Sequence, residues 1–328
     1  MVEPAIGLAG DTRHRRPVVV AGGVFVAASL VASAVAPGFG LLLAAQCVGG
    51  FSAGAFVSLS QASLMDLAPG TRERNMARWM VVGSLGAVTG PLVLAGATFT
   101  GRGWREVFVL LALCTLPLLV MAWRAHAPDP IGDDEPHDAR PPLLAGLKAA
   151  LRDREVLRWL LALETGDLLG DVLLGFLALY LVDVAGASAG FGGFAVAVWS
   201  GAGIIGGAAL VRLTRTMDGA RYLRVSAPVA LALYPAFLLV PSPAAKVAVV
   251  AVLGVVTAGW YPIAQARLFA SLHGRSGTAI AVSSLTAPVG LVVPVIVAAV
   301  ATAAGLQVAM WLLLAGPIAL FLVVPRAR

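Results

Sequence analysis

Ten apolar stretches, each long enough to cross a lipid bilayer as a helix, recur through this chain of 328 residues. About 20 helical residues, at a rise of about 1.5 Å each, match a hydrocarbon core about 30 Å thick. No water reaches that core to satisfy exposed backbone groups, so runs of this length favour helices. We predict ten transmembrane helices, at residues 17–36, 41–64, 79–98, 107–123, 156–182, 192–211, 225–240, 247–270, 279–302 and 308–324.

The composition agrees with a membrane protein and excludes a soluble one. Hydrophobic residues make up 59% of the chain and charged residues 12%, whereas charged residues are about 25% of a typical soluble domain. We therefore expect an all-α integral membrane protein surrounded by the lipid bilayer. The sequence carries no spacing typical of metal ligands and no cofactor-binding loop, so we expect neither a metal nor a cofactor.

Basic residues are distributed very unequally between the predicted loops. When the loops are assigned alternately to two sides, 20 of the 23 Lys and Arg residues fall on the side of the N-terminus. The other side receives only Arg102, Arg105 and Lys246. The positive-inside rule makes the richer side the cytoplasm. We predict a multi-pass protein of the cell (cytoplasmic) membrane with both termini in the cytoplasm, and we expect no nucleic-acid partner.

Three acidic residues lie inside the fifth stretch. Glu164, Asp167 and Asp171 are spaced i, i+3, i+7, which places them on one face of a helix. An acid at the bilayer centre costs roughly 2.5 to 3.5 kcal/mol on insertion scales, so we infer that the three face a water-filled cavity. Burial and like charges favour uptake of a proton there. Helix capping or structural pairing is the alternative, although no Lys or Arg lies in the apolar core of a predicted span.

One long polar segment divides the chain. Residues 125–155 begin with a Pro-rich, acidic stretch typical of a flexible linker, and continue with an amphipathic helical pattern suited to the inner membrane surface. We predict a four-helix N-terminal half at 1–124 and a six-helix C-terminal half at 156–328.

A faint repeat pairs spans one to four with spans seven to ten. Gln61-Ala62-Ser63-Leu64 precedes Gly70, and Gln265-Ala266-Arg267-Leu268 precedes Gly274 at the same distance. A glycine also lies upstream in each case, at Gly54 and Gly259. Spans five and six then have no counterpart in the N-terminal half. A protein built of two six-helix halves, without the first two helices, explains this.

Two motifs resemble the major facilitator superfamily of secondary transporters. Gly7, Asp11, Arg13, Arg15 and Arg16 match the signature loop between that family's second and third helices, although His14 stands where a second Gly is usual. Gly83, Gly86, Gly90 and Pro91 are similar to the antiporter motif of its fifth helix, which is typical of exporters. The resemblance implies two pseudo-repeated helical bundles, with a truncated N-terminal half equivalent to family helices three to six.

The same resemblance implies a secondary active transporter that moves a small molecule by alternating access, and we expect proton-coupled efflux. Its partners are then a small-molecule substrate, protons and the bilayer, and we expect a monomer. The family places the second, fifth and eighth spans around the central cavity. The candidate residues for proton coupling and substrate binding are Gln46, Gln61, Glu164, Asp167, Asp171, Trp260, Tyr261 and Gln265. Ser283, Ser284 and Thr286 join them unless they bond their own helix backbone.

Each motif also has a structural explanation. Asp11 and its basic neighbours can latch the transporter in one state through charge pairs and helix dipoles, or can simply set the topology. The glycines of the antiporter-like motif suit tight static packing as well as movement. Two other functions stay open: an intramembrane enzyme that uses the acidic residues, and a truncated remnant that does not transport.

Overall fold

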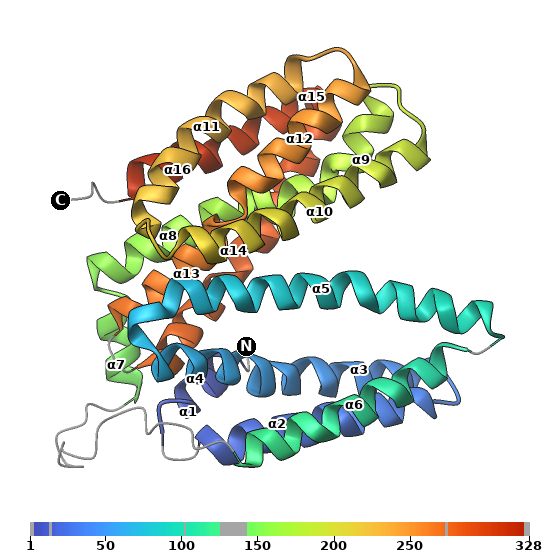
Figure 1. Ribbon diagram of the computed structural model, residues 1–328, viewed down its shortest axis with the longest axis vertical. Coiled ribbons are helices and arrows are strands. Elements are labelled where there is room, and N and C mark those ends of the chain that lie inside the picture. Colours follow the sequence, from blue (N-terminus) through green and yellow to red (C-terminus); the bar gives the residue numbers. More distant parts are fainter. Residues whose placement is uncertain (1–2, 13–14, 102, 125–142, 273–274, 325–328) are drawn as a thin grey trace. The chain divides into compact units, whose positions relative to one another are not determined.

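A computed structural model describes residues 3–12, 15–101, 103–124, 143–272 and 275–324 (Figure 1). The regular elements in these ranges are all helical, as predicted. Nine helices or runs of consecutive helices among them are long and apolar enough to cross a membrane. Their bounds are Arg15–Ala34, Phe39–Leu67, Pro69–Leu94, Trp104–Arg124, Arg154–Asp183, Ala189–Leu213, Gly219–Leu239, Pro243–Ser271 and Leu306–Val323.

These nine spans coincide with nine of the ten predicted stretches. The remaining stretch, 279–302, corresponds to helix α14 (Ser276–Ala304), which has 29 residues. Within the described residues, its part Val292–Ala304 is an apolar helix. The predicted count of ten is therefore approximate.

The chain forms two compact units. Unit 1 comprises Met1–Gly70, Leu85–Arg152 and Phe269–Leu285, and unit 2 comprises Thr71–Ser84, Asp153–Leu268 and Thr286–Arg328. The elements of unit 1 are α1 (Glu3–Ala9), α2 (Arg15–Ala34), α3 (Phe39–Ala53), the π-helix η1 (Gly54–Ser58), α4 (Leu59–Leu67), α6 (Trp104–Arg124) and α7 (Leu143–Ala150). The elements of unit 2 are α8 (Arg154–Asp167), the π-helix η4 (Leu168–Val172), α9 (Leu173–Asp183), α10 (Ala189–Leu213), α11 (Gly219–Leu239), α12 (Pro243–Thr257), α13 (Trp260–Ser271), α15 (Leu306–Met310), η5 (Trp311–Leu314) and α16 (Ala315–Val323). The short η2 (Pro69–Thr71), α5 (Arg72–Phe99) and α14 contribute residues to both units, as does α13, whose last residues Phe269–Ser271 belong to unit 1.

Two segments belong to a different unit from most of the predicted half that contains them. Thr71–Ser84, which includes the first turns of α5, belongs to unit 2, and Phe269–Leu285, which includes the first turns of α14, belongs to unit 1. Polar contacts described below hold both helix starts in these units. The functional division at 1–124, 125–155 and 156–328 stays a prediction, and residues 125–142 of the linker lie outside the described residues. In α7, which follows them, Gly146 lies against the guanidinium group of Arg275.

Small residues allow close helix packing within each unit. In unit 2, α10 and α12 approach so closely that a Cβ added to Gly206 would lie 2.7 Å from the Val255 carbonyl oxygen, and one added to Gly254 would lie 3.1 Å from Ala202 Cβ. In unit 1, where α2 runs beside α3 and α6 (Figure 1), a Cβ on Gly22 would lie 2.8 Å from Ala55 Cβ of η1.

Three spans are interrupted near predicted site residues. The π-helix η1 begins at Gly54 and ends just before the helix that carries Gln61. The turn at 258–259, which contains Gly259, separates α12 from the helix that carries Gln265. The two faintly repeated segments thus both follow a disturbed helix. The third interruption, η4, lies among the acidic residues, and π-helical turns of this kind are frequent at functional sites.

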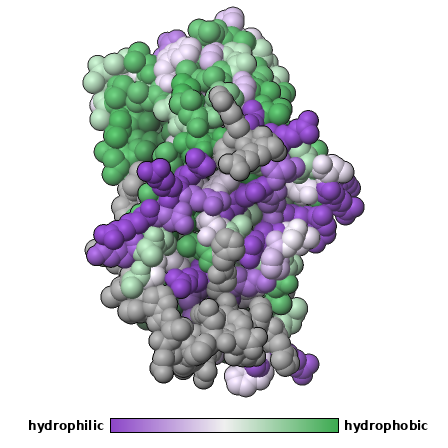
Figure 2. Space-filling view, turned by 90° about the vertical axis from the view of Figure 1, so that its left-hand side faces the viewer, coloured by the Kyte–Doolittle hydropathy of each residue, from purple (hydrophilic) through white to green (hydrophobic). Residues whose placement is uncertain are grey.

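Hydrophobic side chains cover much of the surface, and Figure 2 shows them in areas separate from the hydrophilic ones.

Lys246 is a buried cation, contrary to our prediction that it lies in a loop. It belongs to the first turn of α12 and is 4% exposed. Its Nζ donates hydrogen bonds to the carbonyls of Phe237 and Leu238, at 2.8 and 2.9 Å, and to the Tyr180 hydroxyl at 3.3 Å. The buried cation thereby satisfies carbonyls that the end of α11 leaves without helical partners.

Candidate functional site

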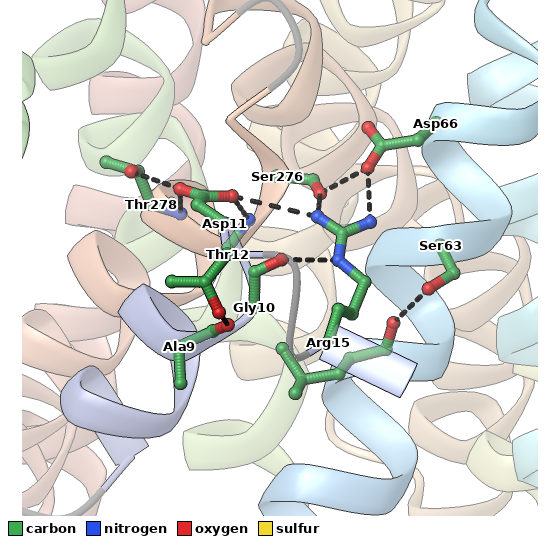
Figure 3. A network of polar contacts seen from close by, with 11 residues as sticks. Ala9, Gly10, Asp11, Thr12, Arg15, Ser63, Asp66, Ser276 and Thr278 are labelled. Carbon is green, nitrogen blue, oxygen red and sulfur yellow. Dashed lines mark hydrogen bonds and ion pairs between the residues drawn. The ribbon is translucent and has the colours of Figure 1, made fainter. Parts of the chain in front are cut away.

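The predicted signature loop forms a buried polar cluster in unit 1 (Figure 3). Arg15, the first residue of α2, is 2% exposed and lies between two carboxylates. Its guanidinium group donates to Asp66 Oδ2 at 2.6 Å, to Ser276 Oγ at 2.7 Å and to the Gly10 carbonyl at 2.5 Å. Asp11 Oδ1 lies 3.7 Å from the same group. Each of the three guanidinium nitrogens thus donates a hydrogen bond, and carboxylates lie on both sides, which explains why a cation is tolerated there.

Asp11 caps the N-terminal end of α14. Its carboxylate accepts hydrogen bonds from the backbone N–H groups of Gly277 and Thr278, both at 2.7 Å, and from the Thr278 hydroxyl at 2.5 Å (Figure 3). Gly277 permits this approach, because a Cβ there would lie 2.7 Å from Asp11 Oδ1. Burial raises the pKa of Asp11, against the hydrogen bonds from Thr278 and Gly277 and the charge of Arg15, which lower it. A carboxylate at a helix N-terminus also meets the positive end of the helix dipole.

Other residues of the motif have different surroundings. Gly7 lies against the start of α14, where an added Cβ would be 2.7 Å from the Gly277 carbonyl oxygen. Arg16 is exposed and donates to the Trp123 carbonyl, while Arg13 lies outside the described residues. Asp66 was not among the predicted site residues, although it accepts hydrogen bonds from Arg15 and from Ser276, the latter at 2.5 Å. Its position in the sequence, shortly after the repeated segment that begins at Gln61, could have pointed to it.

A second polar cluster, in unit 2, was missed entirely. Glu73 in the first turn of α5 accepts a hydrogen bond from Arg267 Nε at 2.6 Å and one from the backbone N–H of Gly219 at 3.1 Å. Arg267 also pairs with Asp218, the residue that precedes α11. This cluster is less buried than the first, since the Arg267 and Asp218 side chains are 32% and 54% exposed. Of its three residues, only Arg267 belongs to a predicted feature, the faint repeat, and Glu73 and Asp218 belong to none.

The acidic residues of the fifth span are brought together in unit 2. Glu164 and Asp167 lie in α8 and are half-buried, whereas Asp171 lies in η4 and is exposed. The three residues follow one another at i, i+3 and i+7 from α8 into η4, and Glu164 lies within reach of the Thr286 side chain of α14. Among the described residues, no Lys or Arg forms an ion pair with any of the three.

The remaining cavity candidates are scattered. Gln46 is exposed and donates to Ser33 Oγ at 3.3 Å. Gln61 is buried in unit 1. In unit 2, Trp260 is buried with its indole N–H donating to Ser226 Oγ at 2.9 Å, which favours a packing role. Tyr261 is half-buried, and Gln265 is buried with its Oε1 lacking a hydrogen-bond partner among the described residues.

The glycines of the antiporter-like motif have no close neighbour among the described residues. At Gly83, Gly86 and Gly90, an added Cβ would meet no described atom within 4 Å. The close helix contacts occur instead at glycines elsewhere, such as Gly206 and Gly22. Both explanations of the motif, tight static packing and movement, therefore stay predictions. Pro91 continues α5, and its side-chain surroundings lie outside the description.

Comparisons with known proteins agree with this architecture. The structure of FucP, a major facilitator superfamily transporter, in the outward conformation has a TM-score of 0.81 and 15% identity, covering 99% of this chain and 86% of its own. The proton:xylose symporter XylE has a TM-score of 0.71 and 14% identity, covering 98% and 82%. The human organic anion transporter MFSD10 has a TM-score of 0.63 and 23% identity, covering 98% and 80%. No curated protein sequence matches the chain.

These similar structures are transporters, and the resemblance predicted from Gly7, Asp11 and the basic residues is confirmed at the level of the family. The alternative of an intramembrane enzyme is set aside with it. The model of the Major Facilitator Superfamily matches residues 1–293, and the chain belongs to this family of transporters.

Proposed function

We propose that the protein is a proton-coupled secondary transporter that exports a cationic or polar small molecule by alternating access. The observation that carries the proposal is the group of three carboxyls, Glu164, Asp167 and Asp171, inside one membrane span and without an ion-pair partner in the described part of the chain. Unpaired acids at membrane depth are costly, and they are usually retained where they bind ions or protons.

The chemistry follows from competition for the same negative charge. Three neighbouring carboxylates repel one another, so the group is stabilised either by taking up a proton or by binding a cationic group. A substrate that leaves on one side of the membrane is replaced by a proton there, and the reverse exchange occurs on the other side. In an alternating-access cycle, the binding groups stay near the middle of the membrane while the protein opens to each side in turn.

The clusters around Arg15 and Arg267 supply contacts that such a cycle can make and break. Each joins a carboxylate to an arginine and to a helix N-terminus, by Asp11 at α14 and by Glu73 at α11. The basic loops around them support a cytoplasmic location for both clusters and for both termini. We place the protein in the cell membrane as a monomer, in line with the predicted topology.

Two further observations support proton coupling and export. FucP and XylE are described as proton symporters of fucose and of xylose, which shows that proton coupling occurs in proteins with this fold. The direction of transport rests on Gly90 and Pro91, which resemble the antiporter motif of exporters.

Transport by the purified protein in proteoliposomes tests this function. With an imposed pH gradient, a panel of fluorescent organic cations should show flux that Asp167→Asn and Asp171→Asn each reduce at least tenfold. Asp183→Asn, at the far end of the same span, is the matched control and should leave flux unchanged. Undiminished gradient-driven flux in both cluster variants would remove the coupling role, and flux driven only into the cytoplasmic side would exclude export.

A further inference from the structure

One membrane span of unit 2 is interrupted, and a tyrosine of a neighbouring helix fills the interruption. The turn at 258–259, the elbow, separates α12 from α13 within the span Pro243–Ser271. The Tyr222 ring of α11 lies so close to Gly259 that a Cβ added to this glycine would be 2.3 Å from the ring atom Cε1. A glycine at the elbow thus makes room for the ring.

The Tyr222 hydroxyl also satisfies a carbonyl that the interruption leaves free. The last four carbonyls of a helix have no partner within it. Tyr222 Oη donates a hydrogen bond to the Val256 carbonyl at 2.8 Å and lies 3.5 Å from the Val255 carbonyl oxygen. Just after the elbow, Trp260 Nε1 donates to Ser226 Oγ of α11 at 2.9 Å. α11 therefore holds the chain both before and after the elbow.

Two further helices of unit 2 pack on the elbow. A Cβ added to Gly206 of α10 would lie 2.7 Å from Ala258 Cβ, and one added to Gly166 of α8 would lie 3.5 Å from Trp260 Cβ. Interiors packed in this way resist changes of volume and angle. A different bend between α12 and α13 would require these contacts to separate together with the hydrogen bonds of Tyr222 and Trp260.

The start of α11 also holds the later part of α13. Arg267 pairs with Asp218, which caps α11, and donates from Nε to Glu73 Oε1 at 2.6 Å. At a rise of about 1.5 Å per residue, Arg267 lies about 10 Å along α13 from Trp260. A tilt of about 10° at the elbow would move its backbone by about 2 Å, which exceeds the tolerance of a hydrogen bond. The angle of the elbow thus sets the reach of the arginine.

We propose that Tyr222 is a positioning residue, which fixes the elbow and thereby keeps Arg267 in reach of Glu73 and Asp218. This inference rests on the proposed function and deepens it, because it identifies what lets the contacts around Arg267 form again in each transport cycle. Tyr222 acts through the direction of α13 and does not bind the substrate. Its loss should therefore slow the cycle without weakening substrate binding.

A double-variant comparison tests the link between the elbow and Arg267 without transport. Tyr222→Phe keeps the ring and removes the hydroxyl, and Arg267→Met removes the group that is positioned. Equilibrium unfolding in mixed micelles measures both. If Tyr222 positions Arg267, their combined effect on the unfolding equilibrium constant should be at least threefold smaller than the product of the single effects. Tyr234→Phe is the matched control, because it also removes a hydroxyl bond made by α11, here to the Met310 carbonyl at 2.8 Å. Its effect should simply multiply with that of Arg267→Met.

Hydrogen exchange followed by mass spectrometry tests the elbow itself. Tyr222→Phe should speed exchange at least tenfold in a peptide that covers residues 257–265, because backbone groups at a loosened bend open more often. Tyr234→Phe should leave this peptide unchanged. Unchanged exchange in Tyr222→Phe, or single effects that multiply in its double variant with Arg267→Met, would overturn the positioning role.

Transport measurements separate this inference from the proposed function. In proteoliposomes, Tyr222→Phe should lower the maximal flux at least threefold at an unchanged KM, and Tyr234→Phe should change neither. A raised KM at an unchanged maximal flux, or wild-type flux despite faster exchange at the elbow, would contradict the role of Tyr222 in the cycle. If the wild-type protein shows no gradient-driven flux, the proposed function fails, whereas the unfolding and exchange results still decide whether Tyr222 positions Arg267.

Discussion

Replacing Arg15 with methionine should strongly destabilise the protein. The side chain is 2% exposed and faces Asp11 and Asp66, whose side chains are 5% and 10% exposed. Methionine fills a similar length without the charge, so both carboxylates lose their cation while remaining buried. The N-terminus of α14 offsets part of this charge at Asp11 but does not reach Asp66 through any hydrogen bond of its backbone among the described contacts.

The magnitude follows from the number of contacts that are lost. Removing one partner of a buried ion pair costs about 3–5 kcal/mol, mainly because the other charge stays buried and unpaired. Arg15→Lys keeps a cation but has a single nitrogen for three acceptors, so we expect a loss of about 1–3 kcal/mol. In Arg15→Met combined with Asp66→Asn, one of the two unpaired charges, that of Asp66, is removed as well. The double variant should therefore be more stable than the sum of the two changes by about 1–3 kcal/mol.

Equilibrium unfolding in mixed detergent micelles, followed by tryptophan fluorescence, measures these free energies. Arg16→Met is the matched control, because the neighbouring arginine is exposed and, within the described part of the chain, donates to the Trp123 carbonyl alone. We expect the control to lose less than about 1 kcal/mol. Equal losses for Arg15→Met and Arg16→Met would refute the reasoning, since they would show that burial of the ion pair contributes nothing.

Three further predictions concern other parts of the chain. Glu73→Gln should lower the free energy of unfolding by less than about 1 kcal/mol, and the loss should shrink at high salt in the same assay, because Arg267 is partly exposed to solvent. Lys246→Met should cost about 1–3 kcal/mol, since the buried Phe237 carbonyl loses its side-chain donor and the Leu238 carbonyl keeps only the Tyr180 hydroxyl as one, and the melting temperature in detergent should fall accordingly. Gly206→Ala should cost about 1–3 kcal/mol through overpacking while Gly86→Ala should be neutral, and melting curves of the two variants compare them directly.

Much of the fold could be predicted because the bilayer imposes it. Apolar runs of fixed length, such as 156–182, correspond closely to helices in the structure, here Arg154–Asp183. The role of Asp11 as a helix cap was also accessible, since an acid in a short turn beside basic residues suits a helix N-terminus. The partner helix α14 was not, because nothing local to Asp11 specifies a contact with Thr278, which lies 267 residues further along the chain.

Other features depended on three-dimensional neighbours that no local pattern contains. Lys246 appeared to be a loop charge because it precedes an apolar run, yet the carbonyls at the end of α11 take it into the interior. The glycines of α5 have the helical spacing of a packing face, as do Ala202 and Gly206 of α10. Among the described residues, the α10 pair meets a neighbouring helix and the α5 glycines do not. Spacing therefore identifies a smooth helix face but not what covers it.

The two polar clusters show why one was found from the sequence and the other was not. In unit 1 a loop carboxylate, Asp11, caps the start of α14, whereas in unit 2 the helix residue Glu73 caps the start of α11. Both caps need a glycine, because a Cβ at Gly277 or Gly219 would lie 2.7 or 2.6 Å from the capping carboxylate. Both clusters use the same chemistry, a carboxylate that caps a helix N-terminus and pairs with an arginine, but the carboxylate comes from a loop in unit 1 and from a helix in unit 2. A search for the family's loop pattern finds only the first, since the second has its acid on a helix that the pattern does not include.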